Sequence, residues 1–390
     1  MITEPNQLFA LLASVLALLF YLSTLDYLKG FFKFLPPVIW AYFLPMFLTA
    51  GGITPLQSTV YDWMGDYLLP FSLFLLMLTV DLPAIMKLGR KAITMMLAGT
   101  LGIVIGGPIA FLIFKSFLPP DAWKGFATLS GSWIGGTANM LAMQASVGAP
   151  DSIVGPIIVV DTVVGYGWMG VLIFLSAFQV RFDKWVGADN SAIEQANTRL
   201  QELDTTRRPT QLNDLVYMLG LGLGGTVIAK ALGNMLPVLG NPTIISHTTW
   251  SILIVVTIGL SLSFTPLRKL ERAGASKMGF LALFLLLTSI GAKADLRALW
   301  EVPLYMAAGA VWITIHISIL IMVAKLMKAP LFFVATGSMA NIGGAASAPI
   351  VASVYHPAMA PVGLLMGVSG YFLGIYAAIG CAWILGQLAM

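Results

Sequence analysis

Residues 131–139 read GSWIGGTAN, and residues 337–347 read GSMANIGGAAS. Each stretch places two adjacent glycines among small polar residues, inside a long apolar segment. Because glycine is about 1 kcal/mol poorer than alanine in a helix interior, two adjacent glycines predict an unwound stretch. Inside a bilayer, an unwound backbone is tolerated only where it is buried in protein or lines a cavity. The two stretches therefore predict a pair of broken membrane helices.

The two glycine motifs belong to an internal repeat that extends over most of the chain. Three further matches occur in the same order, and all four are offset by 205 to 211 residues. They are FLLMLT (74–79) with LFLLLT (283–288), ITP (53–55) with FTP (264–266), and VVGYG (163–167) with VSGYF (368–372). Two homologous membrane halves are typical of secondary transporters, in which the repeats exchange roles during alternating access.

The composition places most of the chain in a membrane. Of the 390 residues, 58% are hydrophobic and 10% are charged, and the mean hydropathy is +0.89. A soluble domain contains about 25% charged residues, so a water-soluble enzyme is excluded. Apolar segments recur near the length of about 20 residues that crosses the hydrocarbon core. They lack the alternation of a membrane β-barrel. We predict an all-α membrane protein with about five or six transmembrane helices in each half.

Charge divides the chain into these halves. The only long polar stretch lies between Arg181 and Asp214 and contains eleven charged residues. We therefore predict an N-terminal transmembrane repeat at 1–180, a polar linker at 181–212 and a C-terminal transmembrane repeat at 213–390.

The basic residues predict that the two halves have opposite orientations. Lys29 and Lys33 have no basic counterpart in the second half, and the basic cluster at 268–277 has none in the first. Since basic loops tend to be cytoplasmic, this bias favours inverted halves. Six crossings in each half would leave the halves parallel, so either one segment fails to cross or one further segment is missing from the count. The glycine-rich segment 213–236 is the candidate.

Asp161 is the most unusual charged residue, because it lies in the middle of an apolar segment, IIVVDTVVGYG, without a basic neighbour. A charge at the bilayer centre costs at least about 2.5–3.5 kcal/mol. The carboxyl group is therefore expected to be protonated, to face water or to bind a cation. We predict a coupling-cation site for Na⁺ or H⁺ formed by Asp161, Thr162, Asn139 and Thr137, since hard cations prefer oxygen ligands. The alternative is a neutral carboxyl group hydrogen-bonded between helices.

The residues around the two unwound stretches are predicted to line the solute site. Free carbonyl groups and helix N-termini at such breaks can bind cations and anions, respectively. The predicted residues are Ser132, Gly135, Gly136, Ser338, Asn341, Gly343, Gly344, Ser347, Tyr166 and Tyr371. Close helix packing on small residues is the alternative and requires no ligand. Two motifs at equivalent positions of a repeat favour the site.

Other classes of function find little support. The lone Cys381 excludes an internal disulfide and a cysteine metal cluster, and no P-loop or nucleophile elbow occurs. His316 is expected to make a hydrogen bond in the core. It lies in a different segment from the GS motifs, so we predict no enzyme. The expected partners are a small-molecule solute and the lipid bilayer, without nucleic acid or a cofactor other than Na⁺ or H⁺. A homodimer is left open.

Four segments resemble the YjcL-like family of uncharacterised bacterial integral membrane proteins, and the resemblance extends over nearly the whole chain. They are SGSWIGGTANMLAM, VVDTVVG, ANIGGAASAP and DYLLPFSLFLLMLTVDL (66–82). More distantly, IGGTAN resembles the GGTASN motif of bile acid:sodium symporters, and VVDTVVG resembles the VVDDVLG segment of cation/proton antiporters. This resemblance implies inverted repeats whose broken helices cross near the midplane, with Thr137 and Asn139 at the first crossover and Asp161 at the first position of the antiporter Asp pair. Thr162 stands in place of the second Asp, which disfavours two-proton antiport.

The sequence thus predicts a secondary active transporter in the bacterial cytoplasmic membrane. It would couple Na⁺ or H⁺ to the translocation of a small organic solute by alternating access. The alternative is a cation/proton antiporter without an organic substrate, which Asp161 favours and Thr162 disfavours. A passive channel is a further alternative, which conductance independent of Asp161 would indicate.

Overall fold

The structure, a computed structural model, describes the chain except residues 35–36, 189–207, 295–301 and 357–358. The described residues form helices and loops without a β-strand, which confirms the all-α class. Within these described residues, seven helices are long and apolar enough to cross a membrane, or up to eight when a bent pair is counted as one span. The protein is therefore a multi-pass integral membrane protein. Most of the expected polar linker, 189–207, lies outside the described residues.

The first half contains the following helices. They are α1 (Pro5–Thr24), α2 (Lys29–Phe34), α3 (Pro37–Ala50), α4 (Thr59–Trp63), α5 (Leu69–Leu78), α6 (Leu82–Met86), α7 (Arg90–Phe114), α8 (Ala122–Gly135), α9 (Thr137–Val147), α10 (Asp151–Leu175) and α11 (Gln179–Val186). A π-helical turn, η2 (Met64–Leu68), joins α4 to α5.

The described residues of the second half form a further set of helices. Its helices are α13 (Leu212–Gly233), α14 (His247–Leu262), α15 (Ala275–Lys293), α16 (Val302–Met327), α17 (Leu331–Ile342), α18 (Gly344–Tyr355) and α19 (Ala360–Ala389). Helix α14 meets the short helix η5 (Pro266–Ala273) at a bend of 96°. Segment 213–236, suspected of failing to cross, instead forms the continuous helix α13, which is long and apolar enough to span.

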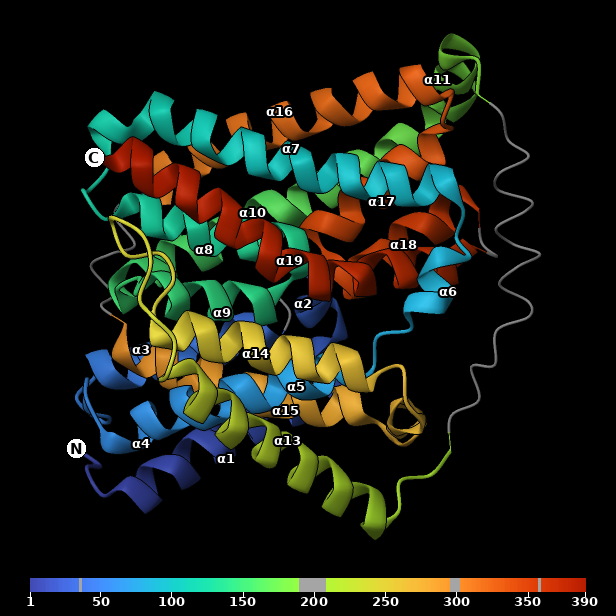
Figure 1. The fold of residues 1–390 in the computed structure, drawn as a ribbon. Coiled ribbons are helices and arrows are strands. Elements are labelled where there is room, and N and C mark those ends of the chain that lie inside the picture. Colours follow the sequence, from blue (N-terminus) through green and yellow to red (C-terminus); the bar gives the residue numbers. More distant parts are fainter. Residues whose placement is uncertain (35–36, 189–207, 295–301, 357–358) are drawn as a thin grey trace.

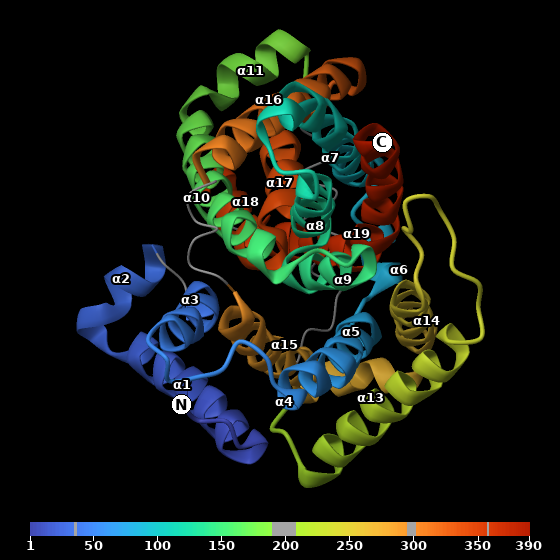
Figure 2. The same ribbon diagram turned by 90° about the vertical axis from the view of Figure 1, so that its left-hand side faces the viewer.

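The helices form two layers, and each layer takes helices from both halves of the chain. Figure 2 shows α7–α11 and α16–α19 gathered into one group, which we call the hairpin layer. Helices α1–α5 and α13–α15 form the other group, which we call the outer layer. The spatial grouping therefore cuts across the predicted division of the chain at 181–212.

Helices α8 and α9 form a hairpin. A Cβ atom built on Gly131 would meet the Asn139 carbonyl group and the Met143 side chain. In a continuous helix, residues 131 and 143 would be about 18 Å apart at 1.5 Å per residue. Gly136 reverses the chain with φ +79° and ψ −173°, a conformation that is essentially restricted to glycine.

Helices α17 and α18 form a second hairpin. The rings of Phe332 and His356 lie 5.4 Å apart, whereas a continuous helix would separate these residues by about 36 Å. The turn lies at Gly343 and Gly344, and Gly344 has φ +58°. The prediction that each broken segment crosses the membrane is thus wrong. The glycine pairs reverse the chain direction instead of unwinding a helix that continues.

The two hairpins enter the bundle from opposite ends (Figure 1). Helix α8 follows the C-terminal end of α7 after a short loop. At the other end of α7, Lys91 Nζ donates a hydrogen bond of 3.2 Å to the carbonyl group of Lys328, just before α17. Because α7 has 25 residues, the bases of the hairpins are separated by about 37 Å along this helix.

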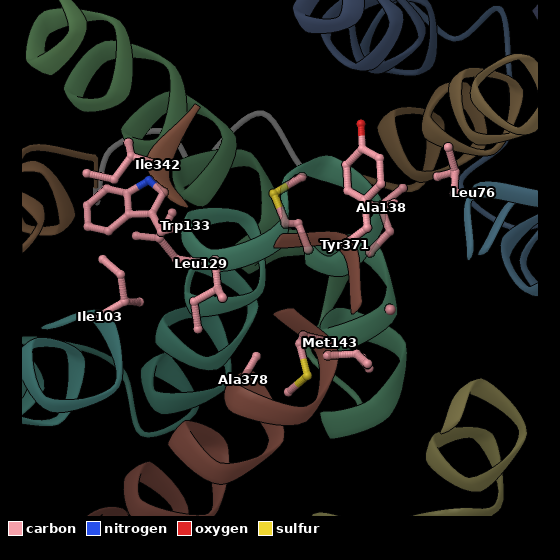
Figure 3. Close-up of a cluster of buried hydrophobic side chains, with 14 of the residues drawn as sticks. Leu76, Ile103, Leu129, Trp133, Ala138, Met143, Ile342, Tyr371 and Ala378 are labelled. Atoms are coloured by element: carbon pink, nitrogen blue, oxygen red, sulfur yellow. The ribbon is translucent and has the colours of Figure 1, made fainter. Parts of the chain in front are cut away.

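The core of the hairpin layer lies where α8 and α9 pack against α19. Figure 3 shows Trp133 and Leu129 of α8, Met143 of α9 and Ala378 of α19 within this core. Glycines allow the close approach, because a Cβ atom on Gly370 would overlap the carbonyl oxygen of Ile134. This packing fixes the position of the first hairpin tip.

Candidate functional site

The tips of both hairpins face one cavity of about 200 Å³ at the seam between the two layers, which we call the hairpin cavity. The hairpin layer supplies the polar side chains of the cavity, and the outer layer supplies only apolar ones. The lining residues are Ile39, Ser132, Gly136, Thr137, Asp161, Thr162, Gly165, Tyr166, Phe280, Phe284, Met339, Ile342, Gly343, Ala346 and Ser347.

Asp161 is the only charged residue among the described residues that line the hairpin cavity. It lies in the middle of α10, whose Asp161, Thr162, Gly165 and Tyr166 all line the cavity. Its polar neighbours include Ser132 and Trp133 of α8. No lysine or arginine is among the described lining residues, so a proton or a bound cation would neutralise the Asp161 carboxylate, or water would solvate it.

Two helix N-termini also meet at the hairpin cavity. Helix α9 begins after Gly136 and α18 begins after Gly343, and neither has a side-chain cap. An uncapped N-terminus presents free backbone N–H groups and is equivalent to about half a positive charge. The C-termini of α8 and α17 end at the same two turns and each is equivalent to about half a negative charge, so the helix ends at the cavity offset one another and Asp161 is its one full charge among the described lining residues.

The structure brings together eight of the residues predicted for the ion and solute sites. They are Ser132, Gly136, Thr137, Asp161, Thr162, Tyr166, Gly343 and Ser347. These residues come from α8, the two turns, α9, α10 and α18, so the cavity brings residues of both repeat motifs close to Asp161. Their roles in binding stay a prediction.

Asn139, predicted to bind the cation, lies outside the lining of the hairpin cavity. Its amide nitrogen donates to the carbonyl groups of Gly370 and Tyr371 in α19, at 3.2 and 2.9 Å. Its Oδ1 atom is buried without a hydrogen-bond partner among the described residues. Gly135 packs against this amide, because a Cβ atom there would overlap it.

Asn341 and Tyr371 also lie outside the lining. The Asn341 amide donates to the carbonyl groups of Met96 and Gly337, at 3.2 and 2.9 Å, and accepts a hydrogen bond of 2.9 Å from Thr100. Tyr371 is buried and contacts Phe280 with ring centroids 6.4 Å apart. Gly344 begins α18 beside the cavity but is not among the lining residues.

Ser338 belongs to a buried chain of hydrogen bonds through His316. The Trp168 indole donates to Ser338 Oγ at 2.8 Å, and Ser338 Oγ lies 2.9 Å from His316 Nε2. His316 Nδ1 lies 3.0 Å from the carbonyl oxygen of Gly99, which can only accept, so Nδ1 carries the proton and Ser338 donates to Nε2. His316 therefore makes the expected core hydrogen bond. His316 of α16 and Ser338 of the second GS motif in α17 lie in different segments, as expected, but they are in contact. Nevertheless, both side chains are fully buried away from the hairpin cavity.

Sequence reasoning missed the apolar wall of the hairpin cavity. Ile39 of α3 and Phe280 and Phe284 of α15 come from the outer layer. Nothing distinguishes them in sequence from other apolar residues of membrane helices. Only the contact between the two layers identifies them.

A second, larger cavity of about 710 Å³ lies between the layers near the base of the first hairpin, and we call it the vestibule. Lys293 of α15 and Asp151 of α10 form an ion pair of 3.1 Å across the two layers there. Lys230 and Asp66 form a second pair of 2.9 Å within the outer layer. Gln144 of α9 donates a hydrogen bond of 2.8 Å to Asp151.

Comparison with known proteins gives a family. The family model described as "Protein of unknown function (DUF819)" matches residues 10–388. The uncharacterized membrane protein YjcL of Bacillus subtilis (strain 168) is 25% identical over 344 residues, which are 85% of this chain and 85% of the relative. The resemblance to YjcL-like proteins is confirmed, whereas the wider antiporter and symporter superfamily stays a prediction. The chain belongs to the DUF819 family of membrane proteins.

Proposed function

We propose that the protein is a secondary active transporter that couples Na⁺ or H⁺ to the movement of a small organic solute. The observation that supports this most strongly is the hairpin cavity, where a single carboxylate lies between two hairpin tips. An ionisable residue in the middle of a membrane bundle is a functional residue by default. An irregular backbone at the same depth is the usual substrate and ion site of secondary transporters.

The coupling would act through the charge of Asp161. A proton or Na⁺ on this carboxylate, with the oxygen atoms of Ser132, Thr137 and Thr162 nearby, would neutralise the cavity and allow the solute to bind. Linkage requires that the solute strengthens cation binding by the same factor. Such mutual dependence distinguishes a coupled transporter from a passive channel.

The arrangement of the hairpins supports inverted repeats. A hairpin enters and leaves the membrane on the same side, so the chain continues on that side. Five crossings and one hairpin in each half would therefore give the two halves opposite orientations. Inverted halves can exchange conformations, which opens the central cavity to each side in turn. The apolar outer-layer wall at Ile39, Phe280 and Phe284 would then form the barrier between the cavity and one of the two sides.

The experiment is uptake of radiolabelled solutes into proteoliposomes that contain the purified protein. Mixtures of small labelled metabolites would be supplied with an inward Na⁺ gradient, an inward H⁺ gradient or no gradient. We expect at least one solute to accumulate above its equilibrium level only with a gradient. Equal uptake in all three conditions would indicate a passive channel, and no uptake under any condition would refute the proposal.

A cation/proton antiporter without an organic solute is the second candidate, because Asp161 is the only charged group among the described residues of the cavity. In the same liposomes, this function predicts that an imposed Na⁺ gradient changes the internal pH without any solute. The Thr162 hydroxyl group cannot carry a second proton at neutral pH, which favours the first candidate.

A further inference from the structure

The described charged side chains are divided unequally between the two ends of the bundle. We call the end at the base of the second hairpin the basic end, and the end at the base of the first hairpin the vestibule end (Figure 1). Asp161 lies between the ends, and Asp26 and Lys29 pair with each other at the start of α2. The other described charges comprise twelve basic and four acidic residues at the basic end, against four basic and five acidic residues at the vestibule end.

Contacts between segments assign these charges to the two ends. Arg268 of η5 pairs with Asp81 at 2.8 Å, just before α6. Asp183 of α11 accepts a hydrogen bond of 2.8 Å from the backbone N–H group of Leu331 at the start of α17. The residues of the basic end are Lys87, Arg90, Lys91, Arg181, Lys184, Arg208, Arg268, Lys269, Arg272, Lys277, Lys325 and Lys328, with Asp81, Asp183, Asp214 and Glu271. Those of the vestibule end are Lys115, Lys124, Lys230 and Lys293, with Glu4, Asp62, Asp66, Asp121 and Asp151.

This asymmetry favours one orientation in the membrane. Lysine and arginine concentrate in the loops on the cytoplasmic side of a membrane protein, whereas aspartate and glutamate have little influence. Twelve basic residues against four therefore favour a cytoplasmic basic end and an external vestibule end. The start of α1 and the end of α19 both lie at the vestibule end (Figure 1), so the same orientation places them outside.

The vestibule reaches the protein surface at its own end of the bundle. Asp62, Asp66, Asn234 and Thr248 line it and are exposed. Its other described polar lining residues include Gln144, the hydroxyl groups of α14 and α15, and the two ion pairs. A polar cavity of this kind can hold water and a hydrated solute.

The vestibule and the hairpin cavity are neighbours on the same seam between the layers. Helices α9, α10 and α15 line both cavities. On α9, Thr137 lines the hairpin cavity and Leu141 lines the vestibule, about 6 Å further along the helix. On α15, Phe284 lines the first cavity and Leu286 the second. The vestibule is therefore the nearest polar space to Asp161 on the vestibule side.

Aromatic side chains pack on the opposite side of the hairpin cavity. Phe280 lies nearer than Phe284 to the start of α15, at the basic end, and the two rings stack with centroids 6.0 Å apart. The ring of Tyr371 lies 6.4 Å from Phe280, and that of Phe20 lies 5.5 Å from Phe284. The seam thus has a polar space toward the vestibule end and an aromatic cluster toward the basic end.

We infer that the vestibule is the external entrance of the transporter, through which the solute and the coupling cation reach the hairpin cavity from outside. This inference rests on the proposed function, because it assigns the side from which that function takes up its solute. The aromatic cluster closes the cytoplasmic side in the conformation that the structure shows.

The orientation is tested first, by labelling single cysteines in a Cys381→Ala background. Met235→Cys is 80% exposed at the vestibule end outside the vestibule, and Lys269→Cys is exposed at the basic end. The probe is a small, membrane-impermeant quaternary-ammonium methanethiosulfonate, applied to right-side-out and inside-out membrane vesicles that contain the full chain. We expect Met235→Cys to react only in right-side-out vesicles and Lys269→Cys only in inside-out vesicles. The reverse pattern, or reaction of either cysteine in both preparations, would overturn the inference.

The entrance is tested with the same probe on Thr137→Cys, which lines the hairpin cavity. We expect this cysteine to react in right-side-out vesicles. A tryptophan that narrows the vestibule, Ala145→Trp on α9, should slow the reaction several-fold. Thr248→Trp, on the exposed rim, provides a second variant that does not disturb the core, and Met235→Trp, at the same end outside the vestibule, is the matched control with an unchanged rate.

The outcomes separate the entrance from transport itself. Absence of reaction at Thr137→Cys from outside, or equal rates in Thr248→Trp and Met235→Trp, would overturn the assignment of the vestibule as the entrance. Gradient-driven uptake together with either of these results would refute the entrance alone. The expected labelling without gradient-driven uptake of any solute would refute the proposed transport alone.

Discussion

The two hairpins share an architecture, but they differ in the helix that flanks them. Asn139 pins the first hairpin to α19, and Asn341 pins the second to α7, so both tips are anchored by an amide. Helix α10 then places Asp161 in the hairpin cavity, whereas the repeat offset of 205 puts the buried Met366 at the matching position of α19. The residues that the two halves share therefore form the cavity, and the position at which they differ, Asp161 against Met366, supplies its charge.

The largest effect is expected when the carboxylate that distinguishes α10 from α19 is removed. We expect Asp161→Asn to abolish gradient-driven accumulation, because no cation can then be exchanged at α10, while the protein still inserts and folds. Met366→Leu, at the matched position, should retain uptake since it conserves volume and carries no charge. Accumulation by Asp161→Asn at the wild-type level would remove Asp161 from the coupling.

The two turns differ in backbone conformation, so substitutions at Gly136 and at Gly344 should have different effects. Alanine at Gly136 would have to adopt φ +79° with ψ −173°, whereas alanine at Gly344 would adopt a φ of +58°. The first conformation is essentially closed to L-residues, and a left-handed φ such as the second costs about 1–2 kcal/mol. Gly136→Ala should therefore lose more uptake and more thermal stability than Gly344→Ala.

Asparagine tolerates the left-handed region better than alanine. Gly344→Asn is therefore expected to recover part of the loss seen in Gly344→Ala, and Gly136→Asn is not. Equal stabilities of the Gly136 and Gly344 variants in a thermal unfolding assay would contradict the assigned turn conformations.

Removal of each anchoring amide should lower the stability, and the two losses should differ by a smaller amount. Asn341 satisfies both ends of its amide, whereas Asn139 leaves Oδ1 buried without a partner among the described residues. Asn341→Ala should destabilise by about 1–2 kcal/mol, and Asn139→Ala by less, because its removal also removes an unsatisfied acceptor. The comparison is a Tm measured for both variants in one detergent. A larger Tm loss for Asn139→Ala would show that Oδ1 binds a partner such as an ordered water or a cation.

The smallest effect is expected at the vestibule. The partly exposed Lys293–Asp151 pair joins the two layers, and the Lys230–Asp66 pair lies within one. Each should contribute less than about 1 kcal/mol to stability. The assay uses a cysteine introduced at Ser132 in a Cys381→Ala background. Adding Lys293→Gln should nevertheless change the rate at which this cysteine reacts from one side of the membrane. Lys230→Gln is the control, and the same rate in both variants would exclude an interlayer role for Lys293.

Much of this structure follows from the sequence. Continuous apolar segments and few charges predicted the all-α membrane class. The paired glycines marked both interruptions of a helix, and five of the residues named around them line the hairpin cavity, as do Asp161, Thr162 and Tyr166 of the polar α10 segment. Glycine pairs do not distinguish an unwound crossing from a reversal, because both need the same conformational freedom. The prediction consequently assigned the segment that fails to cross to 213–236, most of which forms the continuous helix α13. The aromatic wall at Phe280 and Phe284 has no sequence signal, since apolar residues in a membrane helix face lipid and protein alike.

The most direct test of the central claim is equilibrium binding of radioactive sodium to the purified protein, with Asp161→Asn measured beside the wild type at neutral and acidic pH. The claim is that Asp161 binds the coupling cation in the hairpin cavity. We predict saturable sodium binding in the wild type that protons displace at acidic pH and that is lost in Asp161→Asn. If sodium does not bind, proton release on solute addition, measured in the same two proteins, would identify H⁺ as the cation. Sodium binding that persists in Asp161→Asn, or proton release that is equal in both proteins, would contradict the claim.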